Sequence, residues 1–361
     1  MRRNERRRLL HIFPSFSAGG AQARFVTLAN AFGGDFSHQI IALDGDTSYA
    51  DRFQSDVDVK FLKPVLPKGT SWGKICGIRE VLKQQNPDLL ITSNWGSIDW
   101  ALGNGWPRFK HLHMEDGFGS AEQDRQIYRR VLTRRIALRK AQLVLPSRVL
   151  WNLARNTWHL PQQHLNYIPN GIDNQRFAPA AFSSAEVPVI GCVAGLRPEK
   201  NIVRLLRAVA CLKETHKFRL VIAGEGPERD RLEGVARSLE LNVEFLGNVP
   251  DPAPLYRRFA IFSLPSDTEQ MPLSVLEAMS AALPIAATCV GDIHSMVADE
   301  NQEFLTSRDE IALSKSIGGL LDDPARARRI GCANRKRVDA EYGQEMMIQR
   351  WRVMIDGCLS S

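Results

Sequence analysis

Two sets of short apolar runs, with helical patterns between the runs, constrain the fold of this 361-residue chain more than any other feature. Apolar strand-like runs that alternate with helices are typical of parallel α/β sheets. We therefore predict an α/β protein with two doubly wound, Rossmann-like domains. The first set comprises Leu9–Phe13, Gln39–Leu43, Leu89–Thr92 and Leu143–Leu145, and the second comprises Val187–Ala194, Phe218–Ala223, Val243–Leu246, Ala260–Leu264 and Ile285–Thr288.

The region between the two sets is typical of a linker. It contains the turn-rich run Tyr167–Asp173 and a Pro/Ala/Ser-rich stretch from Phe177 to Pro188. Such residues favour loops over regular structure. We expect the first domain to span residues 1–172 and the second to span residues 173–344.

Two glutamates in the second half, Glu269 and Glu277, indicate a ligand site. Glu269 lies in a polar loop, and Pro272 suits the start of a helix. Glu277 then falls about one and a half turns inside that helix. The unpaired N–H groups of a helix start favour a phosphate, and two carboxylates at different depths suit the hydroxyls of a sugar and a ribose. The pattern predicts a nucleotide-sugar site.

The segment from Glu269 to Gly291, EQMPLSVLEAMSAALPIAATCVG, resembles the E-x7-E signature of retaining GT-B glycosyltransferases of family 4. Gln270 and Ala282 stand where that family usually has glycine. The resemblance implies a GT-B fold, in which two Rossmann-like domains face a central cleft. The first would bind the acceptor and the second the nucleotide-sugar, and the last helix, about 345–361, would pack back on the first domain.

A basic loop after the strand that ends at Ala194 suits a diphosphate. Arg197 offers a planar fork for two phosphate oxygens and Lys200 a compact charge. Cations at a helix start are electrostatically misplaced unless an anion lies between them. This loop is similar to the family's G-R-x-x-x-E-K-G segment, with the arginine one place later than usual.

The resemblance also implies roles for other residues. Lys200, Arg197 and the helix start at Met271, Pro272 and Leu273 would stabilise the departing phosphate without a metal or other cofactor. Glu269 would hold the sugar hydroxyls and Glu277 the ribose. The loop that contains Val249 is similar to the one whose backbone meets the nucleobase.

In the first half, the small-residue loop with Gly19 and Gly20 is similar to the family's G-G-A-E loop beneath the donor diphosphate. Within Lys110–Phe118, His113 aligns best with an active-site histidine of the family, and His111, Glu115 and Asp116 are alternatives. The Gly19–Gly20 loop and His113 would help to position the reacting atoms.

Composition points to a cytoplasmic protein. The six cysteines lie far apart, without the close pairs of a zinc site or redox motif, so we expect no metal. No apolar run approaches the ~20 residues that span a bilayer, and the segment after the basic N-terminus is too short for a signal peptide.

Positive charge gathers in the first half. Residues 1–180 hold 25 Lys+Arg against 15 Asp+Glu (+10), whereas residues 181–361 hold 22 against 25 (−3). A basic helical pattern, 124–140, has an apolar face with Ile127, Val131 and Leu138. Such a helix suits an anionic lipid surface on the inner face of the cell membrane. A merely solvated face is the alternative, and nucleic acid is disfavoured because no recognition motif accompanies the charge.

We therefore predict a retaining, metal-independent glycosyltransferase. It would move a hexosyl unit from an NDP-sugar to a hydroxyl acceptor, a lipid-linked or cell-surface glycan precursor. The alternatives are a sugar-nucleotide epimerase of the same architecture and a noncatalytic transferase-like scaffold.

Overall fold

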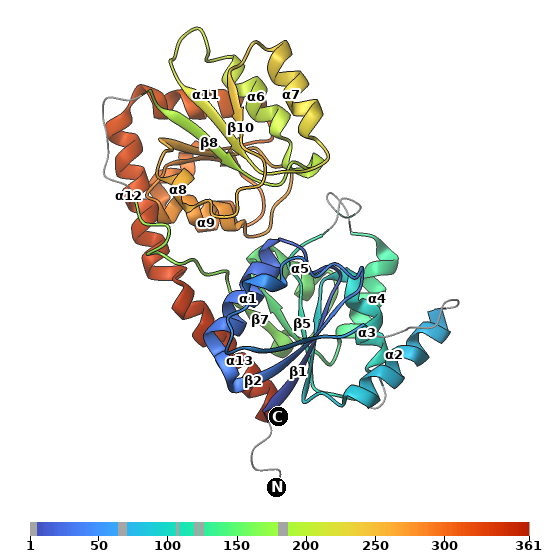
Figure 1. Cartoon of the computed structure of the whole chain (residues 1–361). Helices are drawn as coiled ribbons and strands as arrows, with labels where there is room; N and C mark the ends of the chain where they lie inside the picture. Colours follow the sequence, from blue (N-terminus) through green and yellow to red (C-terminus); the bar gives the residue numbers. More distant parts are fainter. Residues whose placement is uncertain are drawn as a thin grey trace. The chain divides into compact units, whose positions relative to one another are not determined.

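The computed structural model describes residues 6–63, 71–105, 108–118, 122, 126–179 and 187–360. The chain forms two compact units (Figure 1). Unit 1 comprises Met1–Pro169 and Ile348–Ser361, and unit 2 comprises Asn170–Met347. The boundary expected after residue 172 lies close to this division.

Unit 1 contains a seven-stranded sheet in the order β3-β2-β1-β4-β5-β6-β7. Every neighbouring pair of these strands is parallel. Parallel sheets are covered on both faces, which explains why the central strands are apolar throughout. The strands are β1 (Arg7–Phe13), β2 (Phe36–Ala42), β3 (Asp58–Phe61), β4 (Leu89–Ser93), β5 (His111–Met114), β6 (Gln142–Leu145) and β7 (Leu165–Tyr167).

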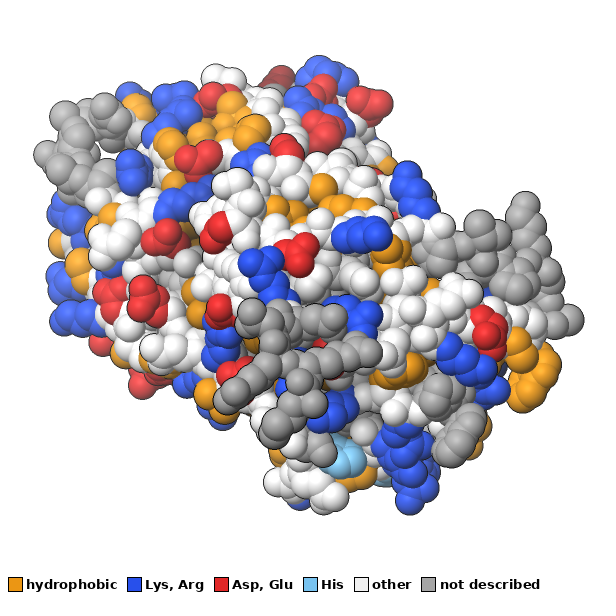
Figure 2. All heavy atoms as spheres, turned by 60° about the horizontal axis from the view of Figure 1, so that its bottom comes forward, with side chains coloured by type: hydrophobic (Ala, Val, Ile, Leu, Met, Phe, Trp, Pro, Cys, Tyr) orange, Lys and Arg blue, Asp and Glu red, His pale blue; other side chains and the backbone are white. Residues whose placement is uncertain are grey.

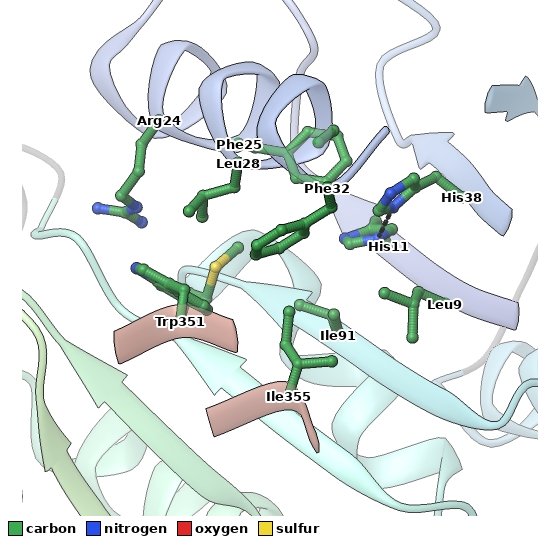
Figure 3. A pocket seen from close by; sticks show the side chains of 12 residues that line it. Leu9, His11, Arg24, Phe25, Leu28, Phe32, His38, Ile91, Trp351 and Ile355 are labelled. Atoms are coloured by element: carbon green, nitrogen blue, oxygen red, sulfur yellow. Dashed lines mark hydrogen bonds between the residues drawn. The ribbon is translucent and has the colours of Figure 1, made fainter. Parts of the chain in front are cut away.

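The helices of unit 1 include the end of the chain. Trp351 and Ile355 of the last helix are buried, and they line a small cavity of about 20 Å³ with residues of β1, β2 and α1 (Figure 3). His11 and His38 meet at this cavity, with 3.0 Å between Nε2 and Nδ1. The helices are α1 (Gly20–Phe32), α2 (Ser71–Gln85), α3 (Ile98–Gly103), α4 (Tyr128–Leu138), α5 (Arg148–Asn156) and α13 (Gln344–Ser360), which belongs to unit 1 from Ile348 onward.

Unit 2 contains a six-stranded sheet in the order β10-β9-β8-β11-β12-β13, again with parallel neighbours. Its strands are β8 (Val189–Val193), β9 (Arg219–Ala223), β10 (Val243–Phe245), β11 (Ile261–Leu264), β12 (Ile285–Thr288) and β13 (Leu305–Thr306). Its helices are α6 (Ile202–Ala210), α7 (Arg229–Ser238), α8 (Ala253–Tyr256), α9 (Leu273–Ser280), α10 (Ile293–Met296), α11 (Glu310–Asp322) and α12 (Pro324–Glu341).

Each sheet has a point where the strand order reverses. In unit 1 this point lies between β1 and β4, and in unit 2 it lies between β8 and β11. Ligands of open α/β sheets bind outside the carboxyl ends of the strands at such a point. The prediction of two doubly wound, Rossmann-like domains is therefore confirmed.

The region expected to be a linker is partly built into unit 2. Phe177 is buried and packs edge-on against Tyr256, with 5.6 Å between ring centroids. Ile172 N donates to Tyr342 O at 2.9 Å, and Gln344 N donates to Ile172 O at 2.9 Å. Residues 180–186 of the expected linker lie outside the described residues. The interpretation of Phe177 as a linker residue was wrong, because its ring fills a core position that loop composition does not reveal.

The basic helix expected in 124–140 is α4, but two of its arginines do not face outward. Arg134 is fully buried, and its guanidinium donates to both carboxylate oxygens of Glu122 at 3.0 and 2.9 Å. Arg130 also donates to Glu122, at 3.2 Å. The expectation that the basic residues of this helix face a lipid surface is therefore corrected for Arg134, which pairs with Glu122 in the interior, while Arg130 pairs with the same carboxylate from a partly exposed position. No helix within the described residues is long and apolar enough to cross a bilayer.

Candidate active site

Lys200 and Glu269 meet at the reversal point of the unit 2 sheet. Lys200 ends a short 3₁₀ helix, Pro198–Lys200, after β8, and Glu269 lies in the loop after β11. Lys200 Nζ lies 2.5 Å from Glu269 Oε1, and their side chains are 16% and 8% exposed. Ser266 Oγ donates to the same oxygen at 2.7 Å. The ion pair therefore stands at the edge of the protein interior, where charge interactions are stronger than in water.

Asp267 holds these two loops together. Its carboxylate accepts from Asn201 Nδ2 at 3.0 Å and from Arg204 at 2.6 Å. Its backbone N–H donates to Glu199 O at 2.8 Å. Asp267 was given no role in the sequence analysis, because its contacts with Asn201 and Arg204 join loops that are more than 60 residues apart in the sequence. Because Asp267 ties the loop of Lys200 to the loop of Glu269, the spacing of the pair is set by the protein.

Glu277 lies about one turn inside α9, slightly less than the one and a half turns expected, because the helix begins at Leu273 and not at Pro272. Its Oε2 accepts from the Tyr256 hydroxyl at 2.6 Å. Burial raises the pKa of Glu277, and the hydrogen bond from Tyr256 opposes that rise. Burial and the neighbouring Glu277 raise the pKa of Tyr256 well above its ordinary value, so the phenol remains a donor. Tyr256 was not anticipated, since it comes from the separate helix α8.

The two glutamates share one arrangement. In each carboxylate one oxygen is held by the protein: Glu269 Oε1 by Lys200 and Ser266, and Glu277 Oε2 by Tyr256. The second oxygen, Oε2 of Glu269 and Oε1 of Glu277, accepts no hydrogen bond from the described residues of unit 2. A carboxylate oriented in this way can accept hydrogen bonds from hydroxyl groups.

The other residues predicted to bind the nucleotide-sugar, apart from the Gly19–Gly20 loop, also lie in unit 2. Arg197 is exposed and pairs with Glu199 at 3.0 Å, so its guanidinium is not buried in the site. Met271 is buried, and its carbonyl accepts from Asn170 Nδ2 at 3.0 Å. Pro272 has an extended backbone and caps α9, which begins at Leu273. Val249 is partly buried against the core of unit 2.

Gly291 packs closely against the backbone of the loop that carries Glu269. Its φ is +58°, and a Cβ there would lie 2.2 Å from Glu269 O. Asp292 N donates to Gln270 O at 2.8 Å. Only glycine fits this contact without displacing the backbone that carries Glu269.

The glycine loop of unit 1 lies at the expected end of its sheet. Gly19 and Gly20 are both exposed; Gly19 ends the loop that follows β1, and Gly20 begins α1. A Cβ on Gly19 would lie 2.7 Å from Gln22 Oε1, and Gln22 itself donates to Ser15 O at 2.8 Å. The role of this loop beneath a diphosphate stays a prediction.

His113 is fully buried within β5. Thr92 Oγ1 lies 2.8 Å from its Nδ1, and Glu115 Oε2 lies 3.4 Å from its Nε2. Both ring nitrogens therefore have neighbours, and in this structure the ring reaches no surface. Glu115 follows the end of β5, and its Oε2 also lies 3.5 Å from Arg134 Nε. Glu115 is also fully buried, and the part of His113 in the reaction stays a prediction.

Asp116, the other acidic alternative, joins α1 to the loop after β5. Arg24 is buried and donates to both carboxylate oxygens of Asp116, at 2.6 and 2.9 Å. Asp116 N donates to Asn94 Oδ1 at 2.7 Å.

Burial, with a smaller contribution from His113, lowers the pKa of His111 to about 3. His111 is therefore a neutral, packed residue at physiological pH.

Within the described residues, no group of three His, Cys, Asp or Glu side chains is arranged to hold a metal ion. Metal-independent chemistry stays a prediction.

The two parallel, doubly wound sheets define an α/β protein with two Rossmann-like domains, and comparison with known proteins gives its family. Residues 173–337 match the family described as "Glycosyl transferases group 1", and residues 18–176 match "Glycosyltransferase Family 4". The chain belongs to these glycosyltransferases.

Individual relatives are more distant. The chain is 28% identical over 205 residues to a GDP-mannose-dependent monoacylated alpha-(1-6)-phosphatidylinositol monomannoside mannosyltransferase of Corynebacterium glutamicum, an alignment that covers 51% of this chain and only 54% of the relative. It is 25% identical over 328 residues to an alpha-1,4-N-acetyl-D-galactosaminyltransferase of Campylobacter jejuni, covering 86% and 88%. The crystal structure of Anabaena HepE in complex with UDP-glucose superposes with a TM-score of 0.82 at 17% identity, covering 97% and 99%.

Proposed function

We propose that this glycosyltransferase moves a hexosyl unit from an NDP-sugar to a hydroxyl acceptor, with retention of anomeric configuration and without a metal. The observation that carries the proposal is the pair of oriented carboxylates, each with one oxygen held by the protein and the other left for a ligand. Glu269 binds hydroxyls of the transferred sugar, and Glu277 binds the ribose.

The chemistry of the step explains the basic residues. When the bond between the sugar carbon and the phosphate oxygen breaks, negative charge develops on the departing diphosphate. Lys200, only 16% exposed, stabilises that charge from a position that Asp267 and Glu269 fix beforehand. Fixed charges of this kind lower a barrier because they need no rearrangement during the reaction. Arg197, which is exposed, adds a second cation once it leaves Glu199.

The acceptor is a lipid-linked or cell-surface glycan precursor. The names of the relatives support this choice: the Corynebacterium enzyme is named for GDP-mannose and a phosphatidylinositol mannoside, and the Campylobacter enzyme for an undecaprenol-linked glycan. HepE was crystallised with UDP-glucose, which supports a sugar nucleotide as donor. Gly19, Gly20 and His113 of unit 1 are assigned to positioning of the reacting groups.

The test is a two-stage screen with the full chain. UDP-, GDP- and ADP-sugars are first compared for thermal stabilisation, because a bound ligand raises stability with its concentration relative to Kd. The stabilising donor is then incubated with glycan and lipid-linked acceptors, and the product anomer is determined. We expect transfer with retained configuration in the presence of EDTA. A new sugar nucleotide formed without acceptor would identify an epimerase, and binding without any turnover would identify a scaffold.

A further inference from the structure

Asn94 lies at the reversal point of the unit 1 sheet. It directly follows β4, which neighbours β1 at that point. Ligands of open α/β sheets bind outside the carboxyl ends of the strands there, so a polar side chain in this place can contact a substrate. Surface charge singles out no such residue, because basic and acidic side chains are intermixed over the face drawn in Figure 2. The conformation and the hydrogen bonds of Asn94 do single it out.

The backbone of Asn94 is strained. Its φ is +58° and its ψ is 176°. Asparagine tolerates the left-handed helical region, where ψ is about +47°, but the combination seen here is essentially restricted to glycine. Glycine would adopt this backbone without strain. An asparagine at such a position indicates that its side chain has a use.

Hydrogen bonds to the protein hold the strained residue on three sides. Asn94 N donates to Met114 O at 2.8 Å, and Asn94 O accepts from Ser97 N at 3.1 Å. Asn94 Oδ1 accepts from Asp116 N at 2.7 Å. This last bond also identifies the oxygen of the side-chain amide, because a backbone N–H can only donate. The Asn94 side chain is therefore anchored at its oxygen.

The amide nitrogen of Asn94 is left for a ligand. Nδ2 donates no hydrogen bond to any residue that the structure describes, and Asn94 is partly exposed. Because Oδ1 is anchored, the two N–H groups of Nδ2 are oriented donors. The carboxylates of Glu269 and Glu277 have the same arrangement with the opposite polarity, since each has one oxygen held by the protein and one left to accept.

The surroundings of Asn94 suit a neutral ligand group. The carboxylate of Asp116 is paired with the buried Arg24, at 2.6 and 2.9 Å, so these two charges compensate each other. The loop after β1 packs against the same turn, because a Cβ on Gly96 would lie 2.7 Å from Pro14 Cγ. A phosphate is bound by cations or by several backbone N–H groups. A single neutral amide suits the oxygen of a hydroxyl group instead.

We infer that Asn94 binds the acceptor, with Nδ2 donating a hydrogen bond to a hydroxyl oxygen of the sugar that the acceptor presents. The inference rests on the proposed function, in which a sugar is transferred to a hydroxyl acceptor and unit 1 is the acceptor-binding domain. It deepens that function by assigning a residue, an atom and a chemical group. Asp116 is a positioning residue, because it acts through Asn94 Oδ1.

Transfer assays with the full chain and the stabilising donor test the inference. The acceptor probes are octyl α-D-mannopyranoside and octyl N-acetyl-α-D-galactosaminide, chosen because the names of two relatives include a mannoside and a GalNAc-containing glycan. Asn94→Gly suits the backbone and removes the amide, so kcat/KM for the glycosylated probe should fall roughly tenfold. Affinity for UDP, GDP or ADP, measured by calorimetry, should stay unchanged and reports that the variant is folded.

A second variant separates ligand binding from anchoring. Asn94→Asp keeps an oxygen for Asp116 N but cannot donate, so kcat/KM for the same probe should also fall, by roughly fivefold or more. Asn152→Asp makes the same change of atoms at an exposed position of α5 and should behave like wild type.

Three results would overturn the inference while leaving the proposed function intact. They are normal transfer by Asn94→Gly, normal transfer by Asn94→Asp, which would show that anchoring through Oδ1 suffices, and equal losses of transfer and of diphosphate affinity, which would assign Asn94 to folding alone. Wild-type protein that glycosylates neither probe would contradict the acceptor of the proposed function, and the inference would fall with it.

Discussion

Lys200 and Glu269, 69 residues apart in the sequence, lie with 2.5 Å between Nζ and Oε1. The pair forms because β8 and β11 are neighbours in the sheet of unit 2, so that the loops at their carboxyl ends meet. An ammonium beside a carboxylate at the edge of the interior gives this site both a cation for a phosphate and an acceptor for hydroxyls.

The two glutamates should differ in what their loss affects. Glu269→Gln should lower kcat strongly and leave affinity for the free nucleoside diphosphate unchanged or higher, because Lys200 loses a competing anion. Glu277→Gln should weaken nucleoside diphosphate and NDP-sugar alike, by about 1 kcal/mol or roughly fivefold. Calorimetry paired with turnover assays separates the two. Equal losses of diphosphate affinity in both variants would contradict the assignment.

Tyr256→Phe should act through Glu277. The phenol donates to Glu277 Oε2 at 2.6 Å and thereby opposes the rise in the pKa of that carboxyl. Without the donor, the pKa should rise further and nucleotide affinity should fall by about 0.5–1.5 kcal/mol, more at acidic than at neutral pH. Calorimetric titrations across pH measure this. The matched control is Phe259→Leu, which removes a neighbouring buried ring without touching Glu277. A pH-independent loss would assign Tyr256 to packing alone.

Ala282→Gly should stabilise the protein. Ala282 has a φ of +57°, in the left-handed region that disfavours side chains with a Cβ. Relief of this strain outweighs the greater freedom of glycine in the unfolded chain, for a net gain of about 0.5–1 kcal/mol. Urea unfolding measures it. Ala281→Gly, one residue earlier at a φ of −77°, should destabilise instead. The prediction is wrong if both substitutions have the same sign.

Acid should destabilise unit 1 through its buried histidines. Burial lowers the pKa of His38 to about 4, and burial together with His38 lowers that of His11 well below its ordinary value. The neighbouring Asp58 acts in the opposite direction on His38. As pH falls from about 6.5 to 4, the unfolded chain takes up protons that the folded protein excludes, so stability is lost in that window.

The size of this effect is roughly 3 kcal/mol for His38, at ~1.4 kcal/mol per unit of pKa. His38→Gln should therefore show a flatter dependence of unfolding free energy on pH between 6.5 and 4. Replacement of the exposed His294 by Gln serves as the control. A slope identical to that of wild type in the His38 variant would show that this histidine is not excluded from protonation.

The sequence predicted the apolar strands, including the edge strand β10, and missed the strands β3, β5, β7 and β13. β1, β4, β8, β9, β11 and β12 are apolar because they are covered on both faces, and each was expected within a few residues. β3 and β13 were not expected, since an edge strand such as Asp58–Phe61 is only partly buried and its side chains need not be apolar. β5 was also not expected, because its two histidines make a buried strand look polar in the sequence.

Residues of the candidate site were predictable only where a local sequence pattern indicated them. Glu277 and Lys200 followed from helix starts and charge, whereas Tyr256 and Asp267 contribute through contacts between separate elements, which periodicity does not encode. The burial of Arg134 was likewise hidden, because an arginine is buried only when partners such as Glu122 compensate its charge.

Calorimetric titration of the full chain with UDP, GDP and ADP tests the central claim, that the Lys200–Glu269 site binds a nucleoside diphosphate. We predict one-to-one binding of at least one of them, weakened on the order of ten- to hundredfold in Lys200→Ala by the loss of a charge-assisted contact. Lys217→Ala, which removes an exposed lysine elsewhere in unit 2, should bind like wild type. Binding of none of the three diphosphates, or equal affinity in wild type and Lys200→Ala, would contradict the account.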